Sequence, residues 1–431
     1  MSKQIQKINI IGAGLAGCEA AYFLANKGFE VNLFEMRPIK QTGAHHTEKF
    51  AELVCSNSLK SKNLDNACGL LKEEIKEMGS ILMESALLNS VPGGNALTVD
   101  RDNFANYIDQ KVRNHPNIHI FNEEVTELKD GINVVCSGPL TSENLVNELS
   151  KHTNKSFLHF FDASAPIVLS ESINMDVAYK KARYDQGDDS YINCPMNKEQ
   201  YHRFLSELLS AKKALVHDFD TNYFEGCMPV EIIASRGVDT LRYGPLKPKG
   251  LRNPHDEDRT PYAVVQLRQD NVFATLYNIV GFQTNLTYGE QKRVFSLIPG
   301  LENAEFIRYG LMHRNTYVNA PELLKADLSL RTNDNIYIGG QLSGVEGYVE
   351  SAATGLYIAY AIYAKLKGFE FNFPKNTMLY SLLHYIINAN PKDFAPMNAN
   401  FGIMYGVTKN NRIQVAEKSL ESIKIFVRDY E

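Results

Sequence analysis

Residues 7 to 35 read Lys-Ile-Asn-Ile-Ile-Gly-Ala-Gly-Leu-Ala-Gly-Cys-Glu-Ala-Ala-Tyr-Phe-Leu-Ala-Asn-Lys-Gly-Phe-Glu-Val-Asn-Leu-Phe-Glu. The apolar residues at the start predict a short buried strand over 8–11, and those near the end predict a second strand over 31–34. Between them, a helix is expected to run to about Lys27 and to end at Gly28. This order of elements is typical of a βαβ unit that binds a dinucleotide. We therefore predict an α/β fold with a Rossmann-like domain.

Three glycines follow the first strand with the G-x-G-x-x-G spacing. The first permits a tight turn, the second lets a pyrophosphate approach the backbone, and the third lets the helix pack near the strand. The free N–H groups at the start of the helix then face the anion. The alternative is an ordinary βαβ turn with a glycine-rich link. The candidate cofactor-binding residues of this turn are Gly12, Ala13, Gly14, Leu15, Ala16 and Gly17.

Glu35 ends the second strand, 18 residues after Gly17. A carboxylate at this place can accept a hydrogen bond from a ribose 2′-OH and would repel a 2′-phosphate. The tightly held dinucleotide is therefore expected to be FAD or NAD(H), not NADP(H). Met36 and Arg37 follow directly and are included as candidate cofactor-binding residues.

A second strand–glycine–helix pattern lies near the end of the chain. Residues 335–341 read Asn-Ile-Tyr-Ile-Gly-Gly-Gln, and residues 343–355 lead into an apolar helix that is expected to reach about Lys367. Two such segments are characteristic of FAD enzymes, in which the second helix directs its positive end at the flavin. This segment favours FAD over NAD and adds Gly340, Gln341 and Gly344 to the candidate cofactor-binding residues.

The composition is that of an ordinary globular protein, with 431 residues, 44% hydrophobic and 22% charged. We expect no membrane span and no signal peptide, because apolar runs are short and the first strand begins almost at once. The six cysteines show no metal-binding spacing, so we expect reduced thiols, no metal and a cytoplasmic location. The net charge of −5 leaves room for a local nucleic-acid site. The oligomeric state is left open.

The middle of the chain, residues 166–325, is richer in Tyr, Arg, Lys and Pro and contains alternating patterns such as that of residues 262–268. We interpret it as an inserted α+β domain with antiparallel sheet, which splits the FAD-binding domain into residues 1–165 and 326–431. Within the first part we expect helices near 69–78, 102–114 and 142–150, and strands near 117–121 and 132–136.

Two cysteines are candidates for chemistry. Cys55 lies in a segment expected to pass over the flavin, and Cys227 lies between Gly226 and Pro229, which suggests an exposed, fixed loop where a thiol can react. The alternative for both is a small buried hydrophobic residue. That alternative is our interpretation for Cys18 and Cys136.

Basic and aromatic residues of the middle region could track phosphates and stack on bases, or could form a solvated charged face. They are Lys180, Lys181, Arg183, Arg236, Arg242, Tyr243, Arg252 and Tyr262. His313 and Arg314 could bind a ligand or be buried polar residues, and the pair His45 and His46 is equally ambiguous.

Beyond these patterns, the chain closely resembles the folate- and FAD-dependent RNA uracil-5 methyltransferases of the TrmFO type, including the branch that acts on 23S ribosomal RNA. The resemblance spans nearly the whole chain and is carried by residues 12–17, 35–38, 45–59, 138–142, 224–229, 268–271, 310–316, 340–353 and 396–402. It implies a GidA/MnmG-like FAD-binding domain with an insertion that binds RNA.

The resemblance also implies a reaction. Family members transfer a one-carbon unit from 5,10-methylenetetrahydrofolate to C5 of a uridine in RNA, and NAD(P)H reduces the flavin, which carries the methylene and supplies the hydride. Because C5 of uracil is a poor nucleophile, a thiolate first adds at C6, and a base later removes the C5 proton. By resemblance Cys227 is the nucleophile and Cys55 the base, His313 stacks on the folate, and Arg314 and Arg268 bind substrate.

Three positions depart from the family pattern: Cys136, Asn285 where histidine is usual, and Lys249. The last two lie in the middle region and leave the RNA open between the T-loop uridine of tRNA, at position 54, and a uridine of 23S ribosomal RNA. Two other hypotheses are an FAD–NAD(P)H oxidoreductase that acts on a small molecule and a non-catalytic RNA-binding flavoprotein.

Overall fold

The computed structural model describes residues 7–153, 158–185, 191–214, 228–256, 259–271, 273–310 and 312–430. Its first sheet has six strands in the order β16-β17-β7-β1-β2-β6, in which only the short β16 runs antiparallel to its neighbour. The strands are β1 (Ile8–Ile11), β2 (Val31–Phe34), β6 (Ile118–Phe121), β7 (Ile132–Val135), β16 (Ser329–Leu330) and β17 (Asn333–Ile338).

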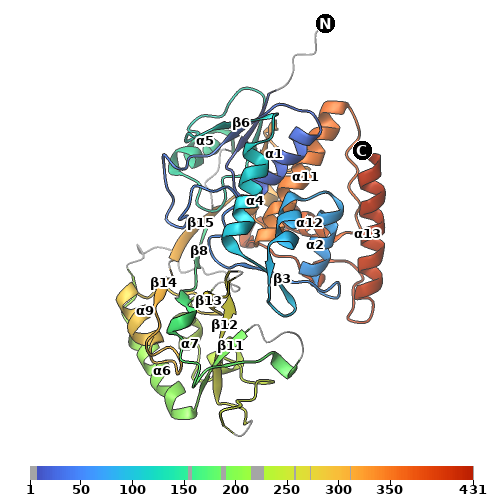
Figure 1. Cartoon of the computed structure of the whole chain (residues 1–431). Helices are drawn as coiled ribbons and strands as arrows, with labels where there is room; N and C mark the ends of the chain where they lie inside the picture. The colour runs from blue at the N-terminus through green and yellow to red at the C-terminus, as the bar shows by residue number, and fades with distance from the viewer. Residues whose placement is uncertain are drawn as a thin grey trace.

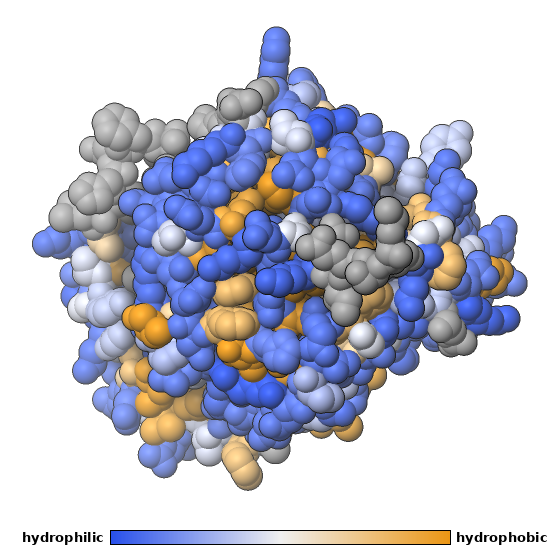
Figure 2. Space-filling view, turned by 90° about the horizontal axis from the view of Figure 1, so that it is seen from above, coloured by the Kyte–Doolittle hydropathy of each residue, from blue (hydrophilic) through white to orange (hydrophobic). Residues whose placement is uncertain are grey.

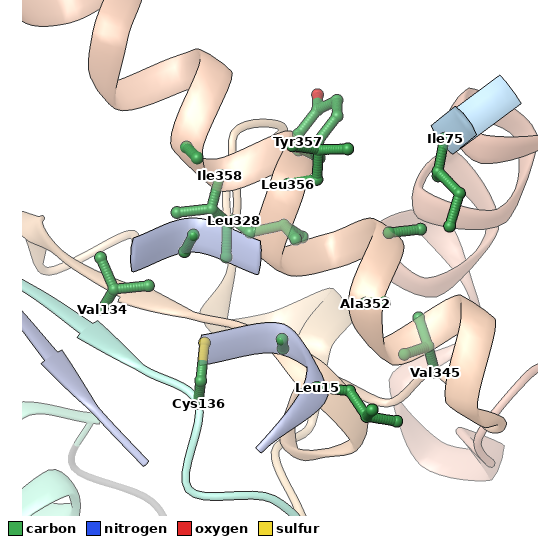
Figure 3. Packing of buried hydrophobic residues seen from close by; sticks show 14 of the residues in the cluster. Leu15, Ile75, Val134, Cys136, Leu328, Val345, Ala352, Leu356, Tyr357 and Ile358 are labelled. Atoms are coloured by element: carbon green, nitrogen blue, oxygen red, sulfur yellow. The ribbon is translucent and has the colours of Figure 1, made fainter. Parts of the chain in front are cut away.

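This sheet joins the two ends of the chain, because β17 pairs with β7. The helices α1 (Leu15–Asn26) and α11 (Tyr348–Lys367) pack against each other, and α3 (Ile81–Leu88) and α4 (Arg101–Arg113) pack against α1. Figure 3 shows Leu15 of the first segment and Leu356 and Ile358 of the last, which belong to one hydrophobic core.

The approach of α1 and α11 depends on glycine. A Cβ atom on Gly355 would lie 2.0 Å from the carbonyl oxygen of Ala16, and one on Gly17 would lie 1.9 Å from that of Gly12. Both obstacles are backbone atoms, which cannot rotate away. Any side chain at these positions would therefore push the helix away from its neighbour.

Three helices of this part meet at one buried carboxylate. Glu74 of α2 (Ala67–Glu77) accepts hydrogen bonds from the backbone N–H groups of Met378 and Leu379, at 2.7 and 2.9 Å, at the start of α12 (Met378–Asn388). It also accepts one at 2.5 Å from the hydroxyl of Ser419 in α13 (Arg412–Asp429). Burial raises the pKa of Glu74 to about 7, against the effect of these bonds. Figure 1 shows the three helices together on one side of the molecule.

The second sheet also has six strands, in the order β10-β11-β12-β13-β9-β14, with antiparallel pairing throughout. Its strands are β9 (Ile167–Leu169), β10 (Tyr179–Lys180), β11 (Tyr191–Met196), β12 (Ala263–Gln269), β13 (Leu276–Ile279) and β14 (Phe306–Arg308). The helices of this part are α6 (Lys198–Ser210), α7 (Val230–Ser235), α8 (Thr240–Tyr243) and α9 (Tyr288–Phe295).

Two hydrophobic cores accompany the two sheets. One is formed by residues between 8 and 149 together with residues between 317 and 430, and the other by residues between 165 and 304. The paired strands β8 (Leu158–Ala163) and β15 (Met312–Tyr317) run between the two parts in Figure 1. The remaining elements are β3 (Ser58–Ser61), β4 (Ser90–Val91), β5 (Ala96–Val99), α5 (Glu143–Thr153) and α10 (Ala320–Leu323).

The expected strands over 8–11, 31–34, 117–121 and 132–136 are confirmed as β1, β2, β6 and β7, and the expected helices as α1, α2, α4, α5 and α11. The helices α12 and α13 and the small sheet β3-β5-β4 were not predicted. The face shown in Figure 2 is mainly hydrophilic, with hydrophobic side chains exposed between hydrophilic ones. Within the described residues, no helix is both long and apolar enough to cross a membrane.

The glycine contact between α1 and α11 generates a prediction. Gly355→Ala should lower the free energy of unfolding by about 1–3 kcal/mol, because the new methyl group meets backbone and the helices must separate. Thermal or denaturant unfolding measures this change. The matched control is Gly289→Ala in α9, where a Cβ meets nothing within 4 Å and should raise stability by up to about 1 kcal/mol. Equal stability of Gly355→Ala and the unaltered chain would contradict the packing argument.

Candidate active site

Both glycine-rich segments line one cavity that is open to solvent. The first segment contributes the turn after β1 and the residues after β2, and the last segment contributes the turn after β17 and the first turn of α11. Lining residues from the predicted set are Gly12, Gly14, Leu15, Ala16, Glu35, Met36, Arg37, Gly340 and Gln341.

The backbone of the first turn suits an anionic ligand. Gly12 has a φ of +99°, which favours glycine, and a Cβ on Gly14 would meet nothing within 4 Å, so the chain is open on that side. The N-cap of α1 is Gly14, which offers no side-chain cap, so the first N–H groups of the helix remain available to a phosphate. The same holds for α11, whose N-cap is Gly347. These features fit the pyrophosphate and flavin ends of FAD.

Glu35 is almost completely buried and is fixed by its neighbours. Its carboxylate accepts hydrogen bonds from the backbone N–H of Ala13 at 3.0 Å and from the side chain of Arg37 at 2.9 and 3.2 Å. Burial pushes the pKa of Glu35 up, but the bonds and charge of Arg37 outweigh this and hold the pKa below its usual range. The Nη1 atom of Arg37 also lies 3.4 Å from Oε2 of Glu52. Glu35 is therefore an ionised group at the wall of the cavity.

The second glycine-rich segment is held by the helix that follows it. The backbone N–H of Gly340 donates to the hydroxyl of Thr354 at 2.6 Å, and Gly344 adopts a φ of +92°. Gln341 donates from its amide to both carboxylate oxygens of Glu346, at 2.9 Å each. Gln341 and Tyr348 then face a second cavity as well as the first.

Cys55 lines this second cavity. The two cavities share Val54, Pro139, Leu140, Gln341 and Tyr348, so the thiol lies next to the dinucleotide site. Cys55 is a half-buried, reduced thiol.

Other side chains of the second cavity come from distant segments. Lys60 donates to Glu350 at 3.1 Å, and although burial opposes its charge, Glu350 raises the pKa of Lys60. Gln283 and Asn315 face the same space from the second half of the chain.

Other predicted residues have mixed outcomes. Cys227 lies outside the described residues, and of His313 and Arg314 the structure describes only the backbone, in β15. Arg268 is buried and donates to Ser56 at 2.6 Å and to Asn57 at 3.2 Å, so it contacts the cysteine segment directly. The roles proposed for these four residues stay predictions.

The remaining cysteines and histidines are placed clearly. Cys18 and Cys136 are buried, and burial raises the pKa of both thiols, to about 12 for Cys136, which confirms their interpretation as packing residues. The adjacent histidines face different spaces. His45 lines the dinucleotide cavity, and His46 lines a third cavity between the start of α4 and the second sheet.

The basic residues of the middle region lie partly together. Arg183 donates to the carbonyl oxygens of Lys247, at 3.1 Å, and Lys249. Arg242 stacks over the ring of Tyr262 at 3.9 Å, next to the exposed Tyr243. Within the described residues, no group of three or more His, Cys, Asp or Glu side chains could hold a metal ion.

Sequence reasoning missed several residues of the site. Three of them lie in segments that the sequence analysis had already noted: Tyr348 and Thr354 in residues 343–355, and Glu52 in residues 45–59. Membership of these segments was the signal that could have found them. Arg101, which binds the carbonyl oxygen of Cys55, carries no local signal. Its partner Asp270 lies in residues 268–271, a segment already noted, but nothing in that segment indicates the pairing.

The parallel sheet, the two glycine-rich turns and the single cavity between them define a flavoprotein of the two-segment, FAD-binding class. A family model described as "Glucose inhibited division protein A" matches residues 7–370. Two structures of Aquifex aeolicus GidA have a similar fold, with TM-scores of 0.73 and 0.69 and sequence identities of 14% and 15%. The superpositions cover 100% and 98% of this chain and 74% and 78% of the GidA chains.

Curated relatives are more similar still. The proteins named methylenetetrahydrofolate--tRNA-(uracil-5-)-methyltransferase TrmFO from Ligilactobacillus salivarius and Acetivibrio thermocellus are 51% and 53% identical to this chain. The alignments cover 97% and 99% of this chain and 98% and 100% of the relatives. The chain belongs to the TrmFO family of methyltransferases, which confirms the resemblance and the GidA-like fold expected from the sequence.

The Glu35–Arg37 pair generates the second prediction. Glu35→Gln should cost about 2–3 kcal/mol of stability and weaken FAD retention, because it leaves a buried guanidinium with one fewer charged partner. The folded-state pKa of Glu35 is lowered, so its contribution is present above the unfolded pKa and is lost as the pH falls through the folded value. Unfolding and flavin release, followed by fluorescence, measure both effects.

The control is Glu30→Gln, which changes an exposed carboxylate of the same βαβ unit that pairs with His119. This variant should stay within about 0.5 kcal/mol of the unaltered chain. If both variants retain FAD equally, Glu35 has no special part in the cofactor site.

Proposed function

We propose that this chain methylates C5 of a uridine in tRNA, with 5,10-methylenetetrahydrofolate as carbon donor and NAD(P)H as reductant. The observation that carries the proposal is that Cys55 lines a cavity sharing five residues with the dinucleotide cavity. This supports a thiol that works beside a flavin. The names of the relatives specify tRNA and the folate donor.

FAD, when bound, would supply the electrons and relay the carbon unit. The chain's own residues would hold it: the N–H groups at the start of α1 would bind the pyrophosphate, Glu35 would bind the adenosine ribose, and the N-terminus of α11 would stabilise the ring. Tyr348 and Gln341, which face both cavities, would separate the flavin from the substrate space.

In the proposed reaction, Cys227 adds to C6 of uracil and makes C5 nucleophilic. Once C5 has bonded to the one-carbon unit, Cys55 removes the C5 proton, and the C6–S bond breaks to release the thiolate of Cys227. The described residues nearest to Cys227 support this assignment. The N–H of Val230 donates to the carbonyl oxygen of Gln283 at 2.7 Å, and Gln283 lines the cavity of Cys55. The chain therefore resumes after Cys227 close to that cavity.

We further propose that residues 166–325 form the RNA-binding domain, inserted between the two parts of the FAD-binding domain. Arg183 beside the 247–249 loop, and Arg242 with Tyr243 and Tyr262, provide cations and aromatic rings on one part of the second sheet. Such groups suit phosphates and unstacked bases. A cytoplasmic location follows from a tRNA substrate.

The function is tested by incubating the FAD-loaded protein with folate donor, NADPH and separate transcripts of tRNA and 23S ribosomal RNA. We expect 5-methyluridine at the T-loop uridine of the tRNA and none in the ribosomal transcript. A tRNA in which that uridine is replaced by cytidine is the control. Methylation of the ribosomal transcript alone would assign the alternative RNA, and methylation of neither would refute the proposal.

The nucleophile is tested with tRNA that contains 5-fluorouridine. Because fluorine cannot leave as a proton does, the adduct with Cys227 should be trapped, and denaturing gels should show a covalent protein–RNA band. Cys227→Ala should abolish this band, whereas Cys68→Ala, which alters a thiol of α2 hydrogen-bonded to Ala399, should retain it. An equal band from Cys227→Ala would reject the assignment.

A further inference from the structure

Arginines bind three successive backbone carbonyl groups around Cys55. Arg101 of α4 donates to the carbonyl oxygens of Leu53 and, at 3.3 Å, of Cys55 itself. Arg308 of β14 donates to the carbonyl oxygen of Val54 between them. A short segment with every carbonyl held by a guanidinium cannot shift without breaking charge-assisted hydrogen bonds.

The N–H groups of the same segment are held from the opposite direction. The backbone N–H groups of Cys55 and Ser56 both donate to the hydroxyl oxygen of Tyr348, at 2.7 and 3.1 Å. Tyr348 lines the cavity that Cys55 also lines. The main chain of Cys55 is thus fixed at its N–H and at its carbonyl, while its side chain remains at the wall of the cavity.

Arg101 is in turn fixed by Asp270, which directly follows β12 of the second sheet. The two groups form a paired contact, Nε to Oδ2 at 3.2 Å and Nη2 to Oδ1 at 2.9 Å. The side chains of Arg101 and Asp270 are only 13% and 4% exposed, which keeps water from competing for these bonds. One guanidinium therefore joins α4, the cysteine segment and the second sheet.

The charged groups around this segment favour an anion at Cys55. The cations are Arg101, Arg308, the Arg268 guanidinium on Ser56, and Lys60, while His46 faces the third cavity with Arg101 and Arg308.

Each nearby acid is already engaged. Asp270 pairs with Arg101, Glu52 with Arg37, Glu350 with Lys60, and Glu346 accepts from Gln341. Tyr348 stays a neutral phenol, since desolvation raises its pKa. Two guanidiniums close to a thiol stabilise its thiolate form.

We propose that Arg101, fixed by Asp270, is a positioning residue of the reaction, which holds Cys55 at the cavity wall and favours its thiolate. The inference deepens the proposed function, because it rests on Cys55 acting as a base there. The pair joins the part of the chain that carries Cys55 and Arg101 to the second sheet, where Asp270 directly follows β12.

The test titrates Cys55 in the FAD-loaded protein without RNA or folate. The rate of alkylation by iodoacetamide is followed against pH, and the Cys55 peptide is quantified by mass spectrometry. Arg101→Gln should slow alkylation at pH 7 about tenfold and move the midpoint of the profile upward, because a nearby cation is lost. Arg101→Lys keeps the positive charge but loses the guanidinium that bonds to two partners at once. In this variant Cys55 should be alkylated at a nearly normal rate, but the turnover rate should fall at least tenfold, with little change in KM for tRNA.

Arg293→Gln is the matched control, because it removes an arginine of α9 that pairs with Glu207 and Glu290 at the surface. Its alkylation profile and its turnover should equal those of the unaltered chain. Flavin absorbance and melting temperature establish that each variant is folded and loaded.

An unchanged alkylation profile in folded Arg101→Gln would overturn the proposal. If Arg101→Gln does not fold, Arg101→Lys decides, and normal turnover in that variant overturns the proposal as well. The two hypotheses fail separately: a chain that methylates no RNA but shows the alkylation shift refutes only the proposed function.

Discussion

The whole site depends on a contact between two helices that only glycine permits. α1 and α11 come from opposite ends of the chain, yet Gly355 approaches the carbonyl oxygen of Ala16 so closely that no Cβ atom could lie between them. Because the helices lie this close, their N-termini open onto one cavity. Two partial positive charges are thereby directed at one ligand, which is what an elongated anionic cofactor with a polar ring requires.

The cysteine segment shows a second kind of organisation, in which side chains of one half hold the backbone of the other. Arg308 of the second sheet donates directly to the carbonyl oxygen of Val54, next to Cys55. Asp270, which follows β12, acts on the same segment through Arg101. The thiol therefore lies where the two halves meet, between a cavity suited to a dinucleotide and surfaces that carry the basic and aromatic residues. A reaction that takes place between a bound flavin and an RNA needs its acid–base group at such a boundary.

The sequence predicted what depends on local pattern. The strand–glycine–helix order of residues 7–35 predicted β1, α1 and β2, and a second copy of that order predicted β17 and α11. It did not predict α12 and α13, whose positions are set by Glu74, a residue more than 300 positions away in the chain from its partners at 378 and 379. Likewise, the sequence did not predict that Arg268 is buried against Ser56 and Asn57, 212 and 211 positions earlier. Contacts of this range leave no periodicity in the sequence.

The order of the strands in the sequence also determines which part of the chain can fold first during synthesis on the ribosome. The core built from residues 165–304 is continuous in sequence, so it can fold as soon as it emerges. The first sheet, by contrast, lacks β17 and the support of α11 until residue 367 has been made. The nascent chain must therefore carry an unfinished nucleotide-binding half, with the flank of β7 uncovered, while its middle is already folded. Residues 333–367 are what closes the cofactor site.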